Sequence, residues 1–553
     1  MSSRTTWRYD RDEATSPHGI VAAKHVLAAE AGAEVLQEGG NAVDAVVAAG
    51  FVAGVVEPFM SGLGGGGFLL AHFPERDERV LVDHPMVAPA AATPSMYNLA
   101  ASGHDADMFG WHKVEGDANI HGHLAAAVPG AVAGLTLALQ EFGTLSRQRA
   151  LAPAIKHAAD GFDISWHTAL MIGLDLALLN RFPSTRATFT NDGYVPTPYP
   201  GWRKPLRQPE LAATLRLIAD QGAQAFYEGS PARAIAAEMR DHGGLISDAD
   251  LARYQPVVME PLRGMYRGHE VLTSPPASGG PTVLETLNLM EQTNLASLGH
   301  NSAEALHWIA ESCLQAFSDR LALLGDPALV DAPWERLISR HYATEQARTF
   351  APDEIRTPAL GLPSQVPRMN TTHVSAIDRW GNSASLTSTL LGGWGSGVTV
   401  PGTGVLLNNG MMWFDPVPGR PNSIAGGKRP LANMAPMLLL AGNRAFLSVG
   451  AMGGRRILNA LPQIVANVVD YNMGMQAAIS APRIDCSTGI VQASSRIPED
   501  TIAALRQIGH TVEVLDEDVL SFEFGSPVGV QNDRGTLRGG ANLFYPAMAV
   551  AVP

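Results

Sequence analysis

The tetrapeptide Asn370-Thr371-Thr372-His373 decides the fold expected for this chain, because the sequence changes character on its two sides. Upstream, residues 351–369 contain four prolines and little periodicity, which is typical of a connector. Downstream, residues 373–377 and 383–390 alternate as strands do, and a turn signal at 378–382 separates them. The two threonines therefore stand at the start of a predicted hairpin, directly after a predicted connector.

A threonine at such a place has a specific chemical use. Its hydroxyl is a weak nucleophile until a base removes its proton, and an N-terminal threonine can use its own α-amine as that base. The reference pKa of an α-amine, about 7.7–8.0, suits this role near neutral pH. The amine exists only if the Asn370–Thr371 peptide bond is broken, by attack of the Thr371 hydroxyl on the Asn370 carbonyl and hydrolysis of the ester. Alone, a threonine pair at a strand start is more often structural.

The composition excludes several other classes of protein. The 553 residues carry a net charge of −14, whereas a broad nucleic-acid surface needs an excess of lysine and arginine. The sequence has no run of 18 apolar residues, and its first residues lack the apolar core of a secretory signal. We therefore expect a cytoplasmic protein that binds neither nucleic acid nor membrane.

The remaining periodicity predicts a mixture of helices and strands. Upstream of the connector we expect helices at 26–37 and 42–56, the second capped by Asn41, then a glycine run at 62–67 and a strand at 68–71. The text from 125 to 325 reads as mainly helical. Downstream we expect strands at 405–407, 437–440 and 445–449 and helices at 456–469 and 500–508. A helical first part and a strand-rich second part predict a layered α/β or α+β fold.

Common cofactor and metal motifs are missing. The glycine run lacks the Gly-Lys-Ser/Thr ending of a phosphate loop, and no Gly-x-Ser-x-Gly or His-Glu-x-x-His motif occurs. Cys313 and Cys486 have no metal-ligand spacing, and His121 and His123 lack a third ligand nearby in the sequence. The sequence predicts no cofactor and no metal.

Ordered motifs along the chain supply the context that the threonine pair needs. From about Gly19 to the C-terminus the chain resembles the gamma-glutamyltranspeptidase family of N-terminal-nucleophile hydrolases. Each motif alone is weak, but their order over the whole chain is specific. The matching segments are Glu38-Gly-Gly-Asn-Ala-Val-Asp-Ala45, Gly62-Leu-Gly-Gly-Gly-Gly-Phe68, Val128-Pro-Gly130, Ser274-Pro-Pro-Ala-Ser-Gly-Gly280, Leu324-Gly-Asp-Pro327, Thr371-Thr-His373, Gly404-Val-Leu-Leu-Asn-Asn409, Lys428-Arg-Pro-Leu431 and Gly453-Gly454.

The resemblance implies a fold, a cleavage and a set of roles. The fold would be a four-layer αββα sandwich, of α+β class. Self-cleavage would give a large subunit, 1–370, and a small subunit, 371–553, which form one interleaved domain. Thr371 would be the nucleophile and Thr389 a hydrogen-bond partner of its hydroxyl, while the backbone N–H groups of Gly453 and Gly454 would form the oxyanion hole. Such donors are worth about 2.7–4 kcal/mol each.

The sequence departs from the family where the substrate would bind. The family's carboxylate-binding arginine aligns with Pro94, and its ammonium-binding aspartate with Trp413. Neighbouring polar contacts fall on Leu391 and Gly410. The family's serine pair becomes Ala432-Asn433, which leaves Asn433 as a candidate contact.

The charges absent from these positions are not replaced nearby. Asp415 lies two positions past Trp413 and is more readily a turn residue before Pro416. Trp394, Trp413 and Leu391 instead indicate an apolar acyl pocket. The segment 414–428 is also short for a lid, which favours a wetter site and hydrolysis over transfer.

The leading hypothesis is therefore a self-processing threonine amidohydrolase that acts on a small acyl amide without an α-amino acid head. Such amides include a dicarboxylic monoamide such as oxamate and a glutaryl side chain as in cephalosporin acylases. Two alternatives remain: a true γ-glutamyl hydrolase or transferase acting on glutathione-like compounds, and a catalytically inactive homologue. The two fragments of one precursor would form a heterodimer in either active case.

Overall fold

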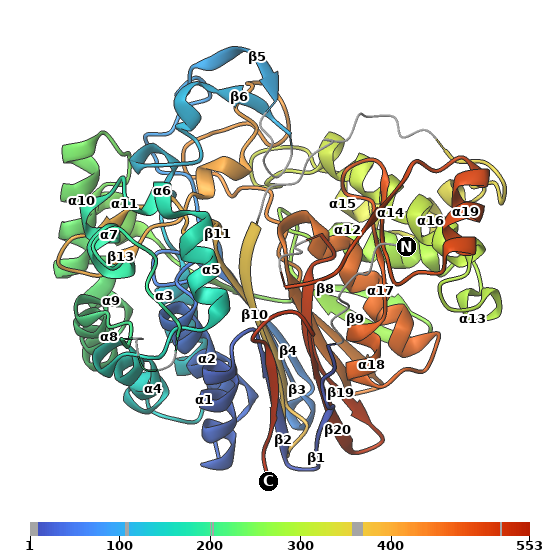
Figure 1. The fold of residues 1–553 in the computed structure, drawn as a ribbon, viewed down its shortest axis with the longest axis horizontal. Coiled ribbons are helices and arrows are strands. Elements are labelled where there is room, and N and C mark those ends of the chain that lie inside the picture. Colours follow the sequence, from blue (N-terminus) through green and yellow to red (C-terminus); the bar gives the residue numbers. More distant parts are fainter. Residues whose placement is uncertain (1–8, 105–109, 200, 202–203, 357–368, 520–522) are drawn as a thin grey trace.

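Two stacked β-sheets with helices on both outer faces form the protein, as Figure 1 shows for this computed structural model. The structure describes residues 9–104, 110–199, 201, 204–356, 369–519 and 523–553, so most of the predicted connector lies outside the described residues. The four-layer αββα fold is confirmed. Among the described residues, no helix combines the length and the apolar character needed to cross a bilayer.

Each large sheet has seven strands, and every neighbouring pair is antiparallel. The first sheet has the order β21 (Met548–Ala551), β2 (Gly19–Ala23), β10 (Met369–Asp378), β11 (Ser383–Gly392), β3 (Gly66–Phe73), β4 (Glu78–His84) and β7 (Val257–Met259). The second has the order β1 (Ala14–Ser16), β20 (Thr536–Ala541), β19 (Ser526–Asp533), β15 (Arg444–Met452), β14 (Met437–Ala441), β9 (His269–Thr273) and β8 (Leu262–Tyr266).

The helices divide between the two outer faces. Beside the first sheet lie α1 (Val26–Gln37), α2 (Ala42–Val56), α3 (Ala131–Phe142), α4 (Arg147–Asp160), α5 (Trp166–Leu174), α6 (Leu176–Leu179), α7 (Pro183–Phe189), α8 (Pro209–Gln221), α9 (Ala223–Tyr227), α10 (Ser230–His242) and α11 (Asp248–Arg253). Beside the second lie α12 (Gly280–Met290), α13 (Leu295–Leu298), α14 (Ala303–Leu323), α15 (Trp334–Leu337), α16 (Arg340–Ala347), α17 (Ile457–Val469), α18 (Met475–Ser480) and α19 (Glu499–Ile508).

Short strands complete the described fold. They are the pair β5 (Leu99–His104) and β6 (His112–Val114), the pair β12 (Thr399–Val400) and β13 (Val405–Leu406), and the three-stranded sheet of β16 (Ile484–Asp485), β17 (Val491–Ser494) and β18 (Val512–Leu515). The β5–β6 hairpin projects from the top of the molecule in Figure 1.

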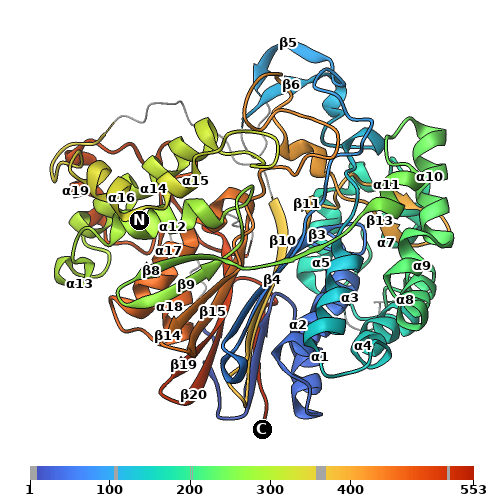
Figure 2. The same ribbon diagram turned by 180° about the vertical axis from the view of Figure 1, so that it is seen from behind.

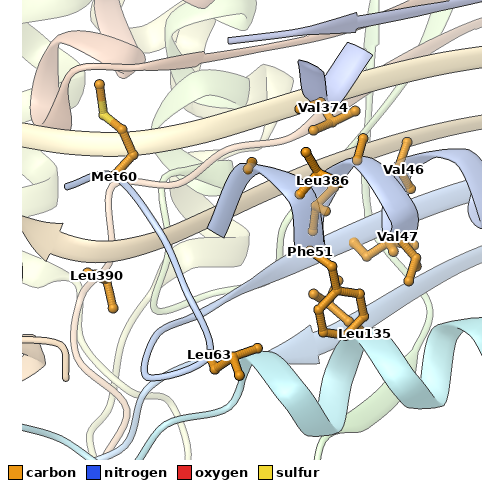
Figure 3. Close-up of a cluster of buried hydrophobic side chains, with 14 of the residues drawn as sticks. Val46, Val47, Phe51, Met60, Leu63, Leu135, Val374, Leu386 and Leu390 are labelled. Carbon is orange, nitrogen blue, oxygen red and sulfur yellow. The ribbon is translucent and has the colours of Figure 1, made fainter. Parts of the chain in front are cut away.

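Helix α2 packs the sheet of β10 and β11 against its covering helices. Its N-terminus is the predicted one: the Asn41 side chain accepts from the N–H of Val43 and Asp44, and Asp44 accepts from the Asn41 N–H in return. This reciprocal capping satisfies N–H groups that a helix start leaves open. Val47 and Phe51 lie against Leu135 and Leu386 in the core (Figure 3).

The glycine run at 62–67 is a packing device, as the sequence indicated. A Cβ on Gly65 would stand 2.2 Å from the carbonyl oxygen of Thr389, and one on Gly67 would stand 2.3 Å from that of Thr387. Both contacts are far below van der Waals distance, so β3 can approach β11 only with glycine at these positions. The run therefore fixes the strand that carries Thr389.

One expectation from the periodicity needs correction. The segment 125–325 is not continuous helix, because β7, β8 and β9 interrupt it; β8 and β9 form an edge of the second sheet next to β14 (Figure 2). These strands are short and half exposed, with the burial of β8 alternating, so they carry no long apolar run. The segment 409–415, for which no element was predicted, contains a 3₁₀ turn, η4 (Gly410–Trp413).

We predict that Gly65→Ala damages the Thr389 strand specifically. Because the added methyl group must displace backbone, the change should cost at least the about 1–3 kcal/mol typical of overpacking. Thermal unfolding measures it. The matched control is Gly173→Ala in α5, where the nearest atom to a new Cβ is a Val195 methyl at 3.6 Å. Equal melting temperatures for the two variants would contradict the packing role.

Candidate active site

The chain runs without interruption through Asn370 and Thr371 at the start of β10, so the structure describes the uncleaved precursor. Asn370 pairs with Leu391 of β11, and Thr372 pairs with Ser388, with a register shift between them. Thr371 therefore sits at a bulge in the strand. A bulge re-aims a side chain that a regular strand would hold in register.

The hydroxyl of Thr389 connects the two sides of the candidate cleavage site. It donates to the carbonyl oxygen of Asn370 at 2.7 Å. It accepts from the Thr371 hydroxyl at 3.2 Å and from the N–H of Leu391 at 2.8 Å. A hydroxyl has one donor and two acceptor positions, so all three are occupied. The proton of Thr371 consequently points at Thr389, and the proton of Thr389 points at the carbonyl oxygen of the peptide bond to be cut.

This arrangement can move a proton without an α-amine, which the uncleaved chain does not have at Thr371. As the Thr371 oxygen attacks the Asn370 carbonyl carbon, its proton can pass to Thr389 while Thr389 gives its own proton to the developing oxyanion. A positioned donor to such an oxygen lowers the barrier in the transition state. Both threonines are buried.

The backbone after Thr389 is held in an unfavourable conformation. Leu391 has φ +87° and Trp394 has φ +62°, a region that bulky L-residues rarely adopt. Leu391 is held there by its N–H bond to Thr389 and by its pairing with Asn370. The Trp394 ring packs on Phe59, and the backbone N–H of Trp394 donates to the Phe59 carbonyl oxygen. Residues with strained backbone conformations cluster at functional sites. The positions of Leu391 and Trp394 therefore point to this site independently of its threonines.

Gly453 and Gly454 form the predicted turn at the end of β15. Their φ values of +122° and +62° favour glycine, and the chain continues into the 3₁₀ turn η5 (Gly454–Arg456) and then α17. η5 contacts β10, the strand of Thr371. The turn conformation is confirmed, whereas the oxyanion role of the two N–H groups stays a prediction.

The other predicted site residues fall into two groups. Gly410 lies near Leu391, because its neighbour Asn409 accepts from the Gly392 N–H at 2.8 Å and donates to the Leu390 carbonyl. Trp413 ends the same turn and is buried. Asn433 belongs to a different neighbourhood: its Oδ1 accepts from the buried Arg320 at 2.8 Å, so this oxygen is already engaged.

The positions aligned with the family's charged contacts contain no replacement. Pro94 is exposed in a turn. Asp415 is buried and paired with Arg420 at 2.9 Å, and it accepts from the Val417 N–H, which confirms the turn interpretation. Among the described residues, neither position offers a free charge to a substrate head group.

The site is closed in the precursor, and the open site expected from a short lid stays a prediction for the cleaved enzyme. Thr371 is 3 % exposed and Trp413 is 2 % exposed. The uncleaved chain itself fills the entrance, because Met369 and Asn370 pair with Gly392 and Leu391 in β10. A hollow of about 440 Å³ is lined by residues that include Asp83, Tyr254 and Arg429, but none of the predicted site residues lines it.

Comparison with known proteins agrees with this geometry. The model of the gamma-glutamyltranspeptidase family matches residues 28–550. This chain belongs to the gamma-glutamyltranspeptidase family. It is 39 % identical over 506 residues to an "Acylase ACY 1 proenzyme" of Pseudomonas sp. (strain V22), covering 91 % of this chain and 88 % of that protein. It is 33 % identical over 554 residues to a "Glutathione hydrolase proenzyme" of Bacillus subtilis (strain 168), covering 97 % of this chain and 91 % of that protein.

A solved structure extends the likeness to the whole fold. The crystal structure of cephalosporin acylase from Bacillus halodurans superposes with a TM-score of 0.88 at 27 % identity, covering 100 % of this chain and 99 % of that one. As a member of the gamma-glutamyltranspeptidase family, the chain is an amide-cleaving enzyme of the N-terminal-nucleophile type.

Sequence reasoning missed a buried charged group that supports this family's nucleophile strand. Glu57 accepts from the Thr372 hydroxyl at 3.4 Å, and Lys24 donates to Ser526 at 2.8 Å. Burial raises the pKa of Glu57 and lowers that of Lys24, while their mutual attraction opposes both shifts. Two charged residues at the ends of apolar runs, Ile20–Ala23 and Val52–Val56, were the signal in the sequence.

His373, the last residue of the opening tetrapeptide, is structural. It lies between the sheets, where its ring contacts the hydroxyls of Thr387 and Ser375 at 2.8 and 3.0 Å. A Cβ on Gly450 of the facing sheet would stand 2.2 Å from the ring. Burial lowers the pKa of His373 to about 3, so the ring is neutral at working pH.

We predict that Thr389→Val slows the breakage of the Asn370–Thr371 bond about 10²–10³-fold, the loss typical when one donor to an oxyanion is removed. Conversion of precursor to fragments, followed by gel densitometry, measures the rate. Thr389→Ser, which keeps the hydroxyl, should convert within about tenfold of wild type.

The matched control is Thr387→Val on the same strand, because its hydroxyl contacts His373 and not Asn370. If Thr387→Val slows conversion as much as Thr389→Val, the effect comes from strand stability and the relay is wrong.

Proposed function

We propose that the chain cuts itself between Asn370 and Thr371, giving a large subunit, 1–370, and a small subunit, 371–553. The single observation that supports this most strongly is the Thr389 hydroxyl bound to both the attacking hydroxyl and the carbonyl oxygen under attack. Attack forms a C–O bond and breaks the C–N bond, and the released amine of Thr371 takes up a proton. Water then hydrolyses the ester and restores the Thr371 hydroxyl.

The mature enzyme uses the amine that the cut creates. The α-amine of Thr371 accepts the hydroxyl proton as the oxygen attacks the substrate's amide carbon. The N–H groups of Gly453 and Gly454 stabilise the oxyanion, and the protonated amine passes its proton to the leaving amine. Water hydrolyses the acyl-enzyme. The Thr371 hydroxyl attacks first the Asn370 carbonyl and later the substrate, so Asn370 must leave the site in between. The departure of Asn370 opens the site that the start of β10 closes in the precursor.

We infer that the preferred substrate is an acyl amide without an α-amino acid head. The residues near the end of β11 are apolar and buried: Leu391, Trp394, Gly410 and Trp413. An ammonium group placed among them would lose its hydration without gaining a partner. Leaving one member of a buried charge pair alone costs about 2–5 kcal/mol, and each 1.4 kcal/mol is about tenfold in affinity.

The comparisons with known proteins also support an acyl amide as the substrate. The acylase proenzyme of Pseudomonas is 39 % identical to this chain, and the glutathione hydrolase proenzyme of Bacillus subtilis is 33 % identical. The cephalosporin acylase structure matches over the full length. A glutaryl amide, which lacks the ammonium but keeps a carboxylate, is one candidate, and an oxamate-like monoamide is the smaller one. Hydrolysis of glutathione is the second candidate function, supported by the Bacillus subtilis relative.

Self-cleavage predicts two bands on a denaturing gel. Scaling the 58.5 kDa chain by residue count gives fragments of about 39 and 19 kDa. Thr371→Ala should leave one band, because no hydroxyl remains to attack. N-terminal sequencing of the small fragment should begin with Thr371. A single band in wild-type protein would support the inactive homologue instead.

The substrate is tested with two p-nitroanilides that differ in one group. Glutaryl-p-nitroanilide has the carboxylate and chain length of γ-glutamyl-p-nitroanilide but lacks its α-ammonium. We expect kcat/KM to be at least about 30-fold higher for the glutaryl compound, from the cost of one unpaired ammonium. Processed Thr371→Ser enzyme serves as a control for the nucleophile. Equal rates, or a preference for the γ-glutamyl compound, would contradict the proposed acyl group but leave self-cleavage intact.

A further inference from the structure

A second cluster of polar side chains is buried on the opposite side of the molecule, among the helices of the second sheet. His307 and Glu311 stand one turn apart on α14, and His510 follows the end of α19. All three residues are buried: His307 and Glu311 are each 2 % exposed, and His510 is 6 % exposed. One potential ligand atom from each lies within 4.8 Å of the other two.

Hydrogen bonds fix which nitrogen of His307 is available. Its Nε2 lies 2.7 Å from the carbonyl oxygen of Ala351, which can only accept, so Nε2 carries the proton. Its Nδ1 therefore presents a lone pair, and this lone pair faces Nε2 of His510 at 2.8 Å. A histidine that donates one ring N–H to a backbone carbonyl and directs the other nitrogen inward is the usual arrangement of a metal ligand.

The carboxylate of Glu311 is only half satisfied. One oxygen, Oε2, accepts from the N–H of Arg356 at 3.0 Å. The other, Oε1, is buried and has no hydrogen-bond partner among the described residues. A buried carboxylate oxygen without a partner is costly, and a cation is a partner that two imidazoles can hold beside it. The charge of Arg356 also acts on Glu311 and would compete with that cation.

We propose that Nδ1 of His307, Nε2 of His510 and Oε1 of Glu311 bind a divalent cation of the zinc type. Two imidazole nitrogens and one carboxylate oxygen are ligands that Zn²⁺ accepts, with water in the fourth position. At Zn–N distances of about 2.0–2.1 Å, a tetrahedral site separates the nitrogens by about 3.3 Å. The rings must open by about 0.5 Å from their hydrogen-bonded separation, and the proton on Nε2 of His510 moves to Nδ1 of the same ring.

Ring orientation distinguishes this cluster from the other histidine–glutamate cluster of the described chain. His123, Glu238 and His242 also bring ligand atoms together, but the two imidazoles are stacked, with planes 10° apart and centroids 4.7 Å apart. A metal lies in the plane of each imidazole that binds it, and nearly parallel planes share no such point. The rings of His307 and His510 meet at 61°, so their planes cross.

If the chain is cleaved as proposed, the three cation ligands come from both subunits of the mature enzyme. His307 and Glu311 lie in the 1–370 fragment and His510 in the 371–553 fragment. Ala351 and Arg356, whose backbone groups bind two of the ligands, lie in the first part of the predicted connector. A bound cation would fasten the end of the large subunit to the small one. The site itself does not require the cut.

The test measures zinc binding by protein made without a polyhistidine tag. Protein is dialysed against chelator and then against buffer with 1 equivalent of ZnCl₂ and a competing indicator, and bound metal is measured by mass spectrometry. We expect about one zinc per chain in wild type, and at least about tenfold weaker binding in Glu311→Gln and His510→Ala. His242→Ala, in the stacked cluster, should bind like wild type. Co²⁺ should give the visible absorption bands of a tetrahedral site.

Two further measurements keep the result decisive. Glu311→Gln preserves the shape of the side chain, so it decides the question if His510→Ala fails to fold. Zinc should also raise the melting temperature of wild type and not that of Glu311→Gln. Wild-type protein that binds no zinc at micromolar concentrations would overturn the proposal. So would zinc binding that persists in Glu311→Gln or disappears in His242→Ala. None of these outcomes bears on whether Thr371 is the nucleophile.

Discussion

The antiparallel pairing of β10 with β11 is the contact on which the site depends. It places Thr389 opposite the bulge at Thr371 and lets one hydroxyl satisfy three partners at once. A displacement of this register by one residue would turn Thr389 to the other face of the sheet. The neighbouring elements prevent such a displacement: β3 approaches closely through its glycines, and α2 packs on the outer face.

The predicted bond-breaking groups and most of the predicted acyl-pocket residues are held in place by different means. The threonines, the strained Leu391 and the glycine turn after β15 are all held by backbone geometry. The residues at Trp413, Gly410 and Trp394 are held by packing and carry no charge. Of the predicted acyl-pocket residues, Trp394, Gly410 and Trp413 lie after β11, whereas Leu391 lies on β11 itself. This division explains how relatives named acylase and glutathione hydrolase can resemble the chain to similar degrees.

The sequence predicted the elements whose signals are local. Asn41 gave the start of α2 correctly because a cap is a local hydrogen bond. The β10–β11 hairpin was predicted because alternation and a turn signal lie within twenty residues of each other. The edge strands β7 to β9 were missed because they are short and lie in largely helical text. The 3₁₀ turn at Gly410–Trp413 was not predicted, for the related reason that buried apolar residues in a short run do not reveal their period.

The site was only partly predictable for a different reason. The pairing of Thr371 with Thr389 came from the resemblance to a family, and the structure adds the direction of each proton. The buried partners Glu57 and Lys24 lie more than 300 residues from the Thr372 strand, so spacing could not associate them with it. The histidine–glutamate cluster joins residues 307 and 510, a separation that no motif search spans.

The order of strands in the two sheets has a consequence for the life of the protein. In each sheet, strands that contain or follow Thr371 lie between strands that precede it: β10 and β11 lie between β2 and β3, and β20, β19, β15 and β14 lie between β1 and β9. One further strand that follows Thr371, β21, pairs with the outer side of β2. The two chains left by a cut would be interlocked and could separate only by unfolding. The bond at Asn370 is poised only after those distant strands have paired. The cut would therefore occur only in correctly assembled chains, and it would be irreversible.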